Sequence, residues 1–213
     1  MDPVTDERLA GMARRALIVG TGVADRIAAG LHDLEIDRRP GAAALDLVVW
    51  ADYAVLARQP SPLVDLTPAE WSAACDTPLR SAIDLTRSVH DPLAATGGTI
   101  VFVVPVMASA GGADYAALAA LGEGVRILAK SLARSWGGSG ITAHAVTLDP
   151  HSFLTSDDAA GIAADNALHD PPLGRVPDDT DDIAPIIAWL SSDTAAPLTG
   201  ASLVIDGGLW MPG

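Results

Sequence analysis

The sequence predicts a single α/β domain built on a doubly wound parallel sheet. Short apolar, β-branched runs typical of buried strands alternate along the chain with longer segments of helical periodicity. A chain of 213 residues suits one domain, and 49% hydrophobic residues with 19% charged residues can form a substantial core. We therefore interpret residues 1–213 as one domain.

The chain begins with a predicted strand, a glycine turn and a helix. Residues 16–19 read Ala-Leu-Ile-Val, Gly20 and Gly22 follow, and residues 23–34 have helical character. This is a Rossmann-like start, but the usual third glycine is missing and Asp25 stands near the helix start. A carboxylate there suits the helix dipole and would repel a bound pyrophosphate.

The next long strand comes early. Only 24 residues, 21–44, separate the glycine turn from the apolar run 45–50, whereas one βαβ unit needs roughly 30. A strand and at least one helix are therefore predicted to be absent. Residues 34–37 are expected to remain as a short second strand.

Two long helices are predicted around a buried strand at 98–104. The first starts with the capping box Thr67-Pro-Ala-Glu70, and Pro78 should kink or divide it before it continues to Val89. The second covers residues 115–136. Small residues beside its apolar stripe predict close approach of another chain or layer, and the stripe consists of Leu118, Leu121, Val125, Leu128 and Leu132.

The C-terminal part predicts a further strand, a loop, a helix and a final strand. Residues 141–148 form the strand, and a loop through Asp157 and Asp158 follows. Asp178, Asp179, Asp181 and Asp182 are interpreted as an acidic N-terminal cap of the helix. The last strand is expected near residues 204–205.

Composition excludes several classes of function. A net charge of -14 disfavours binding to nucleic acid or to an anionic membrane surface. Cys75 is the single cysteine, so no internal disulfide can form, and no set of ligands has zinc spacing. Residues 1–7 are acidic and do not resemble a secretory signal. We expect a soluble cytoplasmic protein without a metal.

Several of these segments resemble the short-chain dehydrogenase/reductase family. The likeness rests on the strand 97–105, on the helix 115–133, and on tail motifs at 172–177, 190–193 and 204–208. It covers most of residues 45–208, whereas 20–44 looks like a truncated cofactor half. The resemblance implies a Rossmann-like sheet, shortened between the family's first and fourth strands.

The resemblance also implies that the catalytic tetrad is lost. The family's serine, tyrosine and lysine fall on Pro105, Leu118 and Gly122, and its asparagine falls on Pro78. None of these residues can donate or accept a proton. Lys130, the only lysine, lies twelve positions after Leu118. An alternative register with Tyr115 as the tyrosine would place Ala119 at the lysine position, so we expect no catalytic residue.

The cofactor half is interpreted as vestigial. Gly20, Gly22 and Asp37 occupy positions where the family binds a dinucleotide, and Arg38 stands where it holds the adenosine phosphate. Asp37 is interpreted as a turn residue. Trp50 and Tyr53 replace the family's nicotinamide-side residues and should fill the vacant space or, alternatively, stack on a different ligand. No cofactor is expected, and NAD(P) would be needed only if the chain were an active oxidoreductase.

These features favour a non-catalytic subunit that pairs with an active relative. In the family, helices matching residues 67–89 and 115–136 and the C-terminal strand form interfaces. The chain is similar to the inactive subunit of heteromeric hydroxyacyl-CoA dehydrogenases, which suggests hydroxyacyl- or ketoacyl-CoA substrates for the complex.

Two alternatives remain open. One is a repurposed cyclase, hydratase or isomerase that uses Tyr53, Tyr115, Asp149 or His151 in the old cleft. The other is an NAD(P)-dependent oxidoreductase. His144 with Asp149 and His151 could also form a metal site or a proton relay, but strand packing and loop solvation are the preferred interpretation.

Overall fold

The computed structural model describes residues 15–165 and 170–211. These residues form one six-stranded sheet in the order β2-β1-β3-β4-β5-β6, and every neighbouring pair is parallel. The α/β class is therefore confirmed. Residues 1–7, on which the targeting expectation rests, lie outside the described part. The strands are β1 Arg15–Gly20, β2 Glu35–Asp37, β3 Leu47–Ala51, β4 Thr99–Pro105, β5 Thr142–Leu148 and β6 Ser202–Ile205.

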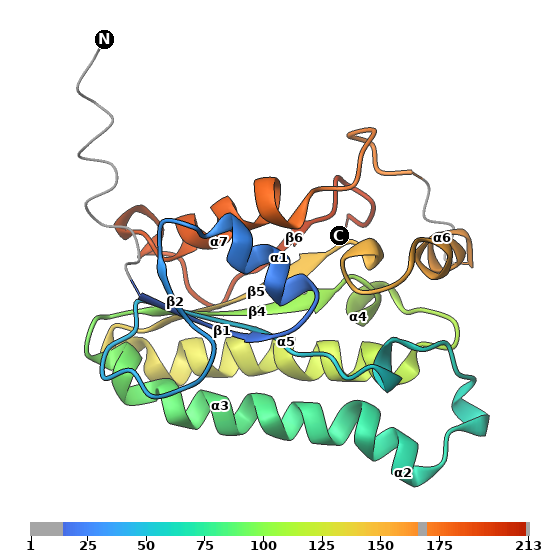
Figure 1. Cartoon of the computed structure of the whole chain (residues 1–213), viewed down its shortest axis with the longest axis horizontal. Helices are drawn as coiled ribbons and strands as arrows, with labels where there is room; N and C mark the ends of the chain where they lie inside the picture. Colours follow the sequence, from blue (N-terminus) through green and yellow to red (C-terminus); the bar gives the residue numbers. More distant parts are fainter. Residues whose placement is uncertain (1–14, 166–169, 212–213) are drawn as a thin grey trace.

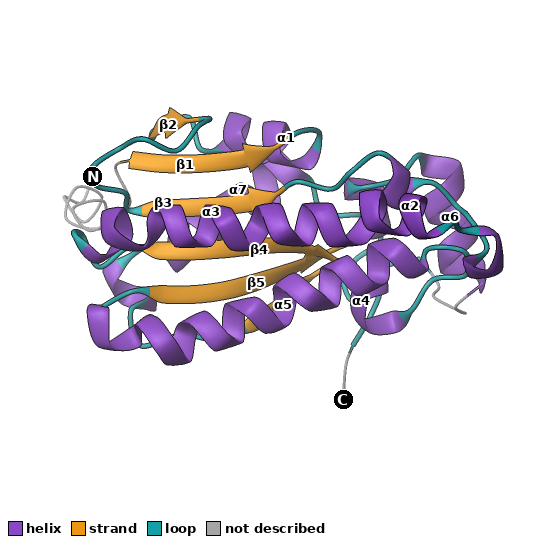
Figure 2. Ribbon diagram, turned by 90° about the horizontal axis from the view of Figure 1, so that it is seen from below, coloured by secondary structure: helices purple, strands orange, loops and turns teal. Residues whose placement is uncertain are grey.

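Helices cover both faces of the sheet (Figures 1 and 2). Helices α1 (Val23–Gly30) and α7 (Ala184–Leu190) lie on one face, and α3 (Thr77–Ala94) and α5 (Ala116–Trp136) lie on the other. Strands β3 and β4 are buried along their whole length. This pattern explains why both strands read as continuous apolar runs rather than as alternating ones.

The segment between the glycine turn and β3 is short, as predicted. Strand β2 has three residues and pairs with β1 alone. Residues 38–46 then lead directly into β3 without a helix. The predicted absence of a crossover is confirmed, and β2 is left as an edge strand.

The first long helix is divided at the predicted place. The capping box is present, because the Glu70 backbone N–H donates to Thr67 Oγ1 at 3.3 Å and the Thr67 N–H donates to Glu70 Oε2 at 2.8 Å. Helix α2 (Pro68–Trp71) passes into a π-helical segment, η4 (Ser72–Asp76), and then into α3. Because Pro78 has no backbone N–H, the ladder must be interrupted next to it.

Much of the apolar stripe of α5 packs against the sheet of the same chain. Leu118, Leu121 and Val125 are fully buried inside this chain, where α5 packs on β4 and β5. Of the two partners expected for the stripe, another chain or another layer, these three residues contact the layer formed by the sheet. A helix that covers a sheet has the same periodicity as a helix at a subunit interface, so the pattern could not separate the two. Leu128 is only half-buried and Ile127 is exposed.

The loop expected through Asp157 and Asp158 is also wrong, because residues Ser156–Asp165 form helix α6. Thr155 explains its start: Thr155 Oγ1 accepts from the Asp158 N–H at 3.2 Å and donates to Asp158 Oδ2 at 2.7 Å. No helix within 15–165 or 170–211 is long and apolar enough to cross a bilayer. The remaining short helices are η2 Leu56–Arg58, η3 Leu63–Asp65, α4 Met107–Ala110, η5 Gly137–Ser139, η6 Pro150–Ser152, η7 Asp179–Ile183 and η8 Asp193–Ala195.

Candidate functional site

The glycine turn joins β1 to α1 at the carboxyl edge of the sheet, where ligands bind in open parallel α/β folds. Gly20 has a φ of 124°, and a Cβ there would lie 2.4 Å from the Ala51 carbonyl oxygen. Gly22 has a φ of 67°. Both glycines are therefore required by the backbone itself, independently of any ligand.

The amino end of α1 is closed by the chain's own side chains. The Gly22 backbone N–H donates to Asp25 Oδ2 at 2.9 Å. Arg38 holds this carboxylate at 2.5 Å and donates to the Gly20 carbonyl oxygen at 2.7 Å. The Arg38 side chain therefore contacts the glycine turn. Asp37 is the last residue of β2 and pairs with Leu17 of β1. An incoming phosphate would meet a negative charge at the position where helix dipoles favour anions.

Aromatic side chains fill the sheet edge next to this turn. Trp50 is fully buried and Tyr53 is 5% exposed, with their ring centroids 5.2 Å apart. Tyr53 also packs against Phe153 at 5.2 Å and donates its hydroxyl to the Val103 carbonyl oxygen at 2.7 Å. The interpretation of Trp50 and Tyr53 as space-filling residues is confirmed. Burial raises the pKa of Tyr53 well above its ordinary value, so its hydroxyl stays protonated.

The four residues singled out by the family resemblance are all buried. Pro105 is the last residue of β4, Pro78 lies in the first turn of α3, and Leu118 is fully buried. A Cβ on Gly122 would lie 2.7 Å from Ala108 Cβ and 3.3 Å from Pro105 Cδ. No side chain beyond a hydrogen atom therefore fits at position 122 without movement of α4. None of the four offers a hydrogen-bond donor from its side chain.

Lys130 lies away from these four residues. Its Nζ donates to the Gly200 carbonyl oxygen at 3.1 Å and so fastens α5 to the segment before β6. This single lysine has a structural contact far along the helix from Leu118.

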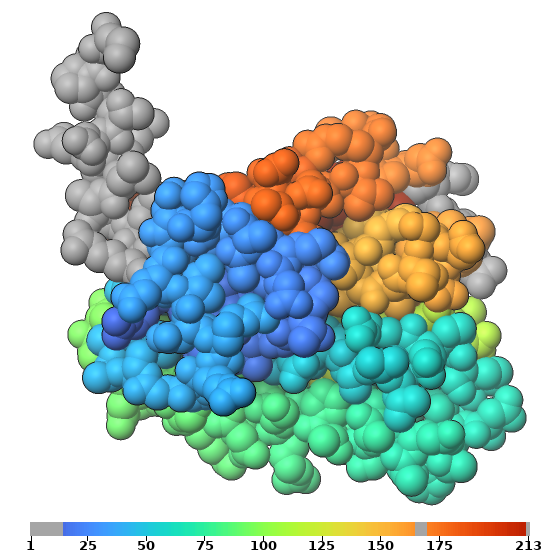
Figure 3. Space-filling model, viewed as in Figure 1, coloured from blue at the N-terminus to red at the C-terminus, as the bar shows by residue number. Residues whose placement is uncertain are grey.

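A pocket of about 680 Å³ opens beside the glycine turn. Its walls come from Gly22 and Arg26 of α1, from residues 55–60, from residues 151–158 and from residues 176–179. In Figure 3 these segments, distant in sequence, meet on one face of the molecule. Its volume is in the range of small-molecule sites.

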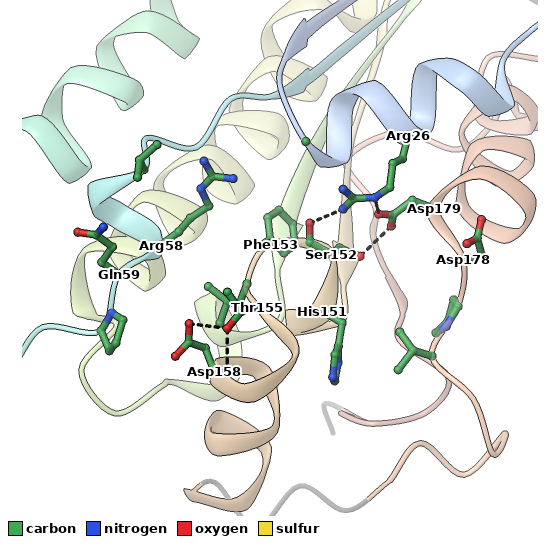
Figure 4. A pocket seen from close by; sticks show the side chains of 16 residues that line it. Arg26, Arg58, Gln59, His151, Ser152, Phe153, Thr155, Asp158, Asp178 and Asp179 are labelled. Carbon is green, nitrogen blue, oxygen red and sulfur yellow. Dashed lines mark hydrogen bonds and ion pairs between the residues drawn. The ribbon is translucent and has the colours of Figure 1, made fainter.

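One wall of the pocket is held by a network of polar side chains (Figure 4). Arg26 donates through Nε to Asp179 Oδ2 at 2.8 Å and through a terminal nitrogen to the Ser152 carbonyl oxygen at 2.8 Å. Ser152 Oγ donates to Asp179 Oδ1 at 2.7 Å. Asp179 was expected to serve only as part of a helix cap, but its carboxylate joins α1 to η6. Its neighbour Asp178 does cap η7, by accepting from the backbone N–H groups of Thr180 and Asp181.

The residues of the alternative readings are only partly brought together. Asp149 and His151 form a pair, with Asp149 Oδ1 2.6 Å from His151 Nδ1. Tyr115 is 4% exposed, and burial with the nearby Asp158 charge raises its pKa to about 12. His144 lies inside β5 without a hydrogen-bond partner, and burial lowers its pKa to about 4. His144 therefore packs within the sheet, and no group of three or more metal-binding side chains occurs in the described chain.

Sequence reasoning missed Arg58, Arg26 and Ser152 as pocket residues. Arg58 is the last residue of the short helix η2, and nothing in its neighbourhood of the sequence marks it. The bond from Arg26 to Asp179 joins residues 153 positions apart. Such pairings depend on how α1 and η7 pack, which no local pattern encodes.

Comparisons with known proteins agree with the fold. The family described as enoyl-(acyl carrier protein) reductase matches residues 43–210. The chain is 31% identical over 153 residues to 3-oxoacyl-(acyl-carrier-protein) reductase FabG of Staphylococcus epidermidis, and the match covers 70% of this chain and 61% of that protein. It is 32% identical over 155 residues to FabG of Salmonella typhimurium, with coverage of 70% and 61%.

A further relative is 2-dehydro-3-deoxy-D-gluconate 5-dehydrogenase of Pseudoalteromonas atlantica, which is 27% identical over 146 residues, or 66% of this chain and 56% of that protein. The chain thus spans about three fifths of the length of the curated relatives that it matches. The family match over most of the chain, the parallel sheet and the glycine turn lead to one conclusion: this protein belongs to the short-chain dehydrogenase/reductase family.

Proposed function

We propose that this chain is a subunit that does not itself transfer hydride and that assembles with an active homologous dehydrogenase or reductase. The single observation that carries the proposal is the closed amino end of α1. Asp25 takes the Gly22 N–H at 2.9 Å, and Arg38 holds Asp25 in place. The position that would receive a cofactor phosphate is occupied by a carboxylate of the protein.

The described residues do not fit a nicotinamide dinucleotide. The short β2 and the direct passage through residues 38–46 leave no second crossover to enclose an adenosine group. Trp50 and Tyr53 are packed into the sheet edge, where the family resemblance places the nicotinamide side. We therefore derive no reaction step through such a cofactor.

The tetrad positions inferred from the family pattern support the same proposal. A proton relay to a carbonyl oxygen needs a donor whose pKa is set by a nearby cation. Leu118 supplies no proton. Ala108 lies so close to Gly122 that a long cationic side chain does not fit at position 122 in this packing. Pro105 and Pro78 add no donor.

Assembly through α3 and α5 is the second part of the proposal. The buried stripe of α5 is used by the sheet, so the contact must involve the outer face of the helix pair. On that face Ile127 is 48% exposed, and Leu79, Ile83 and Leu128 are half-buried. Leu79 packs against Gly124, whose missing side chain lets α3 approach α5 closely. This outer face and β6 are the proposed contact surfaces.

The names of the relatives suggest the substrate of the active partner. FabG is named for 3-oxoacyl groups on acyl carrier protein. We accordingly propose that the complex acts on hydroxyacyl or ketoacyl thioesters, including those of coenzyme A, and that this chain supports the partner's assembly or substrate binding.

Co-expression with an intact relative encoded beside it in the same genome tests the proposal. The tagged chain should retain the relative through size-exclusion chromatography, and Ile127→Asp should release it. Leu173→Asp is the matched control, because Leu173 is 75% exposed and lies outside both helices. The proposal is wrong if the relative elutes separately from the unmodified chain, or if the purified chain alone oxidises a nicotinamide cofactor with a ketoacyl substrate.

A further inference from the structure

We draw no further inference here: the strongest candidate, the groove between strand β1 and helix α3 that is lined by Val19, Arg38, Arg80 and Leu85, carries nothing because no contact of the described residues shows what covers it.

Discussion

Gly122 provides the most direct test of the close packing that excludes a longer side chain from position 122. In Gly122→Ala the new Cβ would lie 2.7 Å from Ala108 Cβ, 3.3 Å from Pro105 Cδ and 3.3 Å from Val104 Cγ1. None of these atoms is the far end of a long flexible chain, so α4 or α5 must shift. Gly124, one half-turn further along the same helix, is the matched control. A Cβ there would meet the ends of the flexible Leu79 side chain at 3.2 Å and 3.3 Å.

The two substitutions have the same helix-propensity gain and opposite packing consequences. Replacing glycine by alanine inside a helix stabilises by about 1 kcal/mol, and overpacking a core costs about 1–3 kcal/mol. We expect Gly124→Ala to be neutral or stabilising, and Gly122→Ala to be destabilising by about 1 kcal/mol. The difference between the two variants should thus be about 2 kcal/mol, or roughly 4–8 °C in Tm for a domain of this size.

Urea unfolding followed by circular dichroism and tryptophan fluorescence measures this difference. Equal slopes of free energy against urea concentration are required for the comparison. A Gly122→Ala protein that is as stable as Gly124→Ala would refute the packing argument, and with it the claim that no larger side chain fits at this position.

The remaining predictions concern the cofactor, the catalytic residues and pH. Calorimetric titration with NAD⁺, NADH, NADP⁺ and NADPH should be flat, because Asp25 occupies the anion position of α1, and micromolar binding of any one would contradict this. The double variant Leu118→Tyr with Gly122→Lys should remain inactive in cofactor oxidation with a ketoacyl substrate, since its lysine has the Cβ clash described above; detectable turnover would show that a cofactor site survives. Burial lowers the pKa of His144 to about 4 in the folded chain, below its ordinary value of 6.5, so the neutral form is favoured by folding. Relative to pH values below 4, this shift makes the folded chain about 3 kcal/mol more stable above pH 6.5, and that stability is lost as the pH falls from 6.5 to 4. The pH slope of the unfolding free energy over this range should therefore be smaller in His144→Leu, and an unchanged slope would count against the effect.

The sequence by itself determined the fold class. Runs such as 98–104 are apolar on both faces because β4 is covered by helices on both sides, and this property can be read without a structure. The capping box at Thr67 and the break at Pro78 depend on neighbours within a few residues, so they were also predictable. The presence of one lysine, Lys130, is a fact of composition.

The tertiary structure decided which side chains meet. Asp25 could be placed near a helix start from sequence, but its partner Arg38 arrives from the end of β2, and its role in closing the turn follows from that contact. The helical periodicity predicted the apolar stripe of α5 but not what the stripe packs against, because a sheet or another subunit can bury an apolar face equally well. Arg58 and His151 share a pocket through packing of segments that lie about ninety residues apart in the sequence. Local patterns report the conformation of a segment, whereas a site depends on non-local contacts, and these form only when the layers pack.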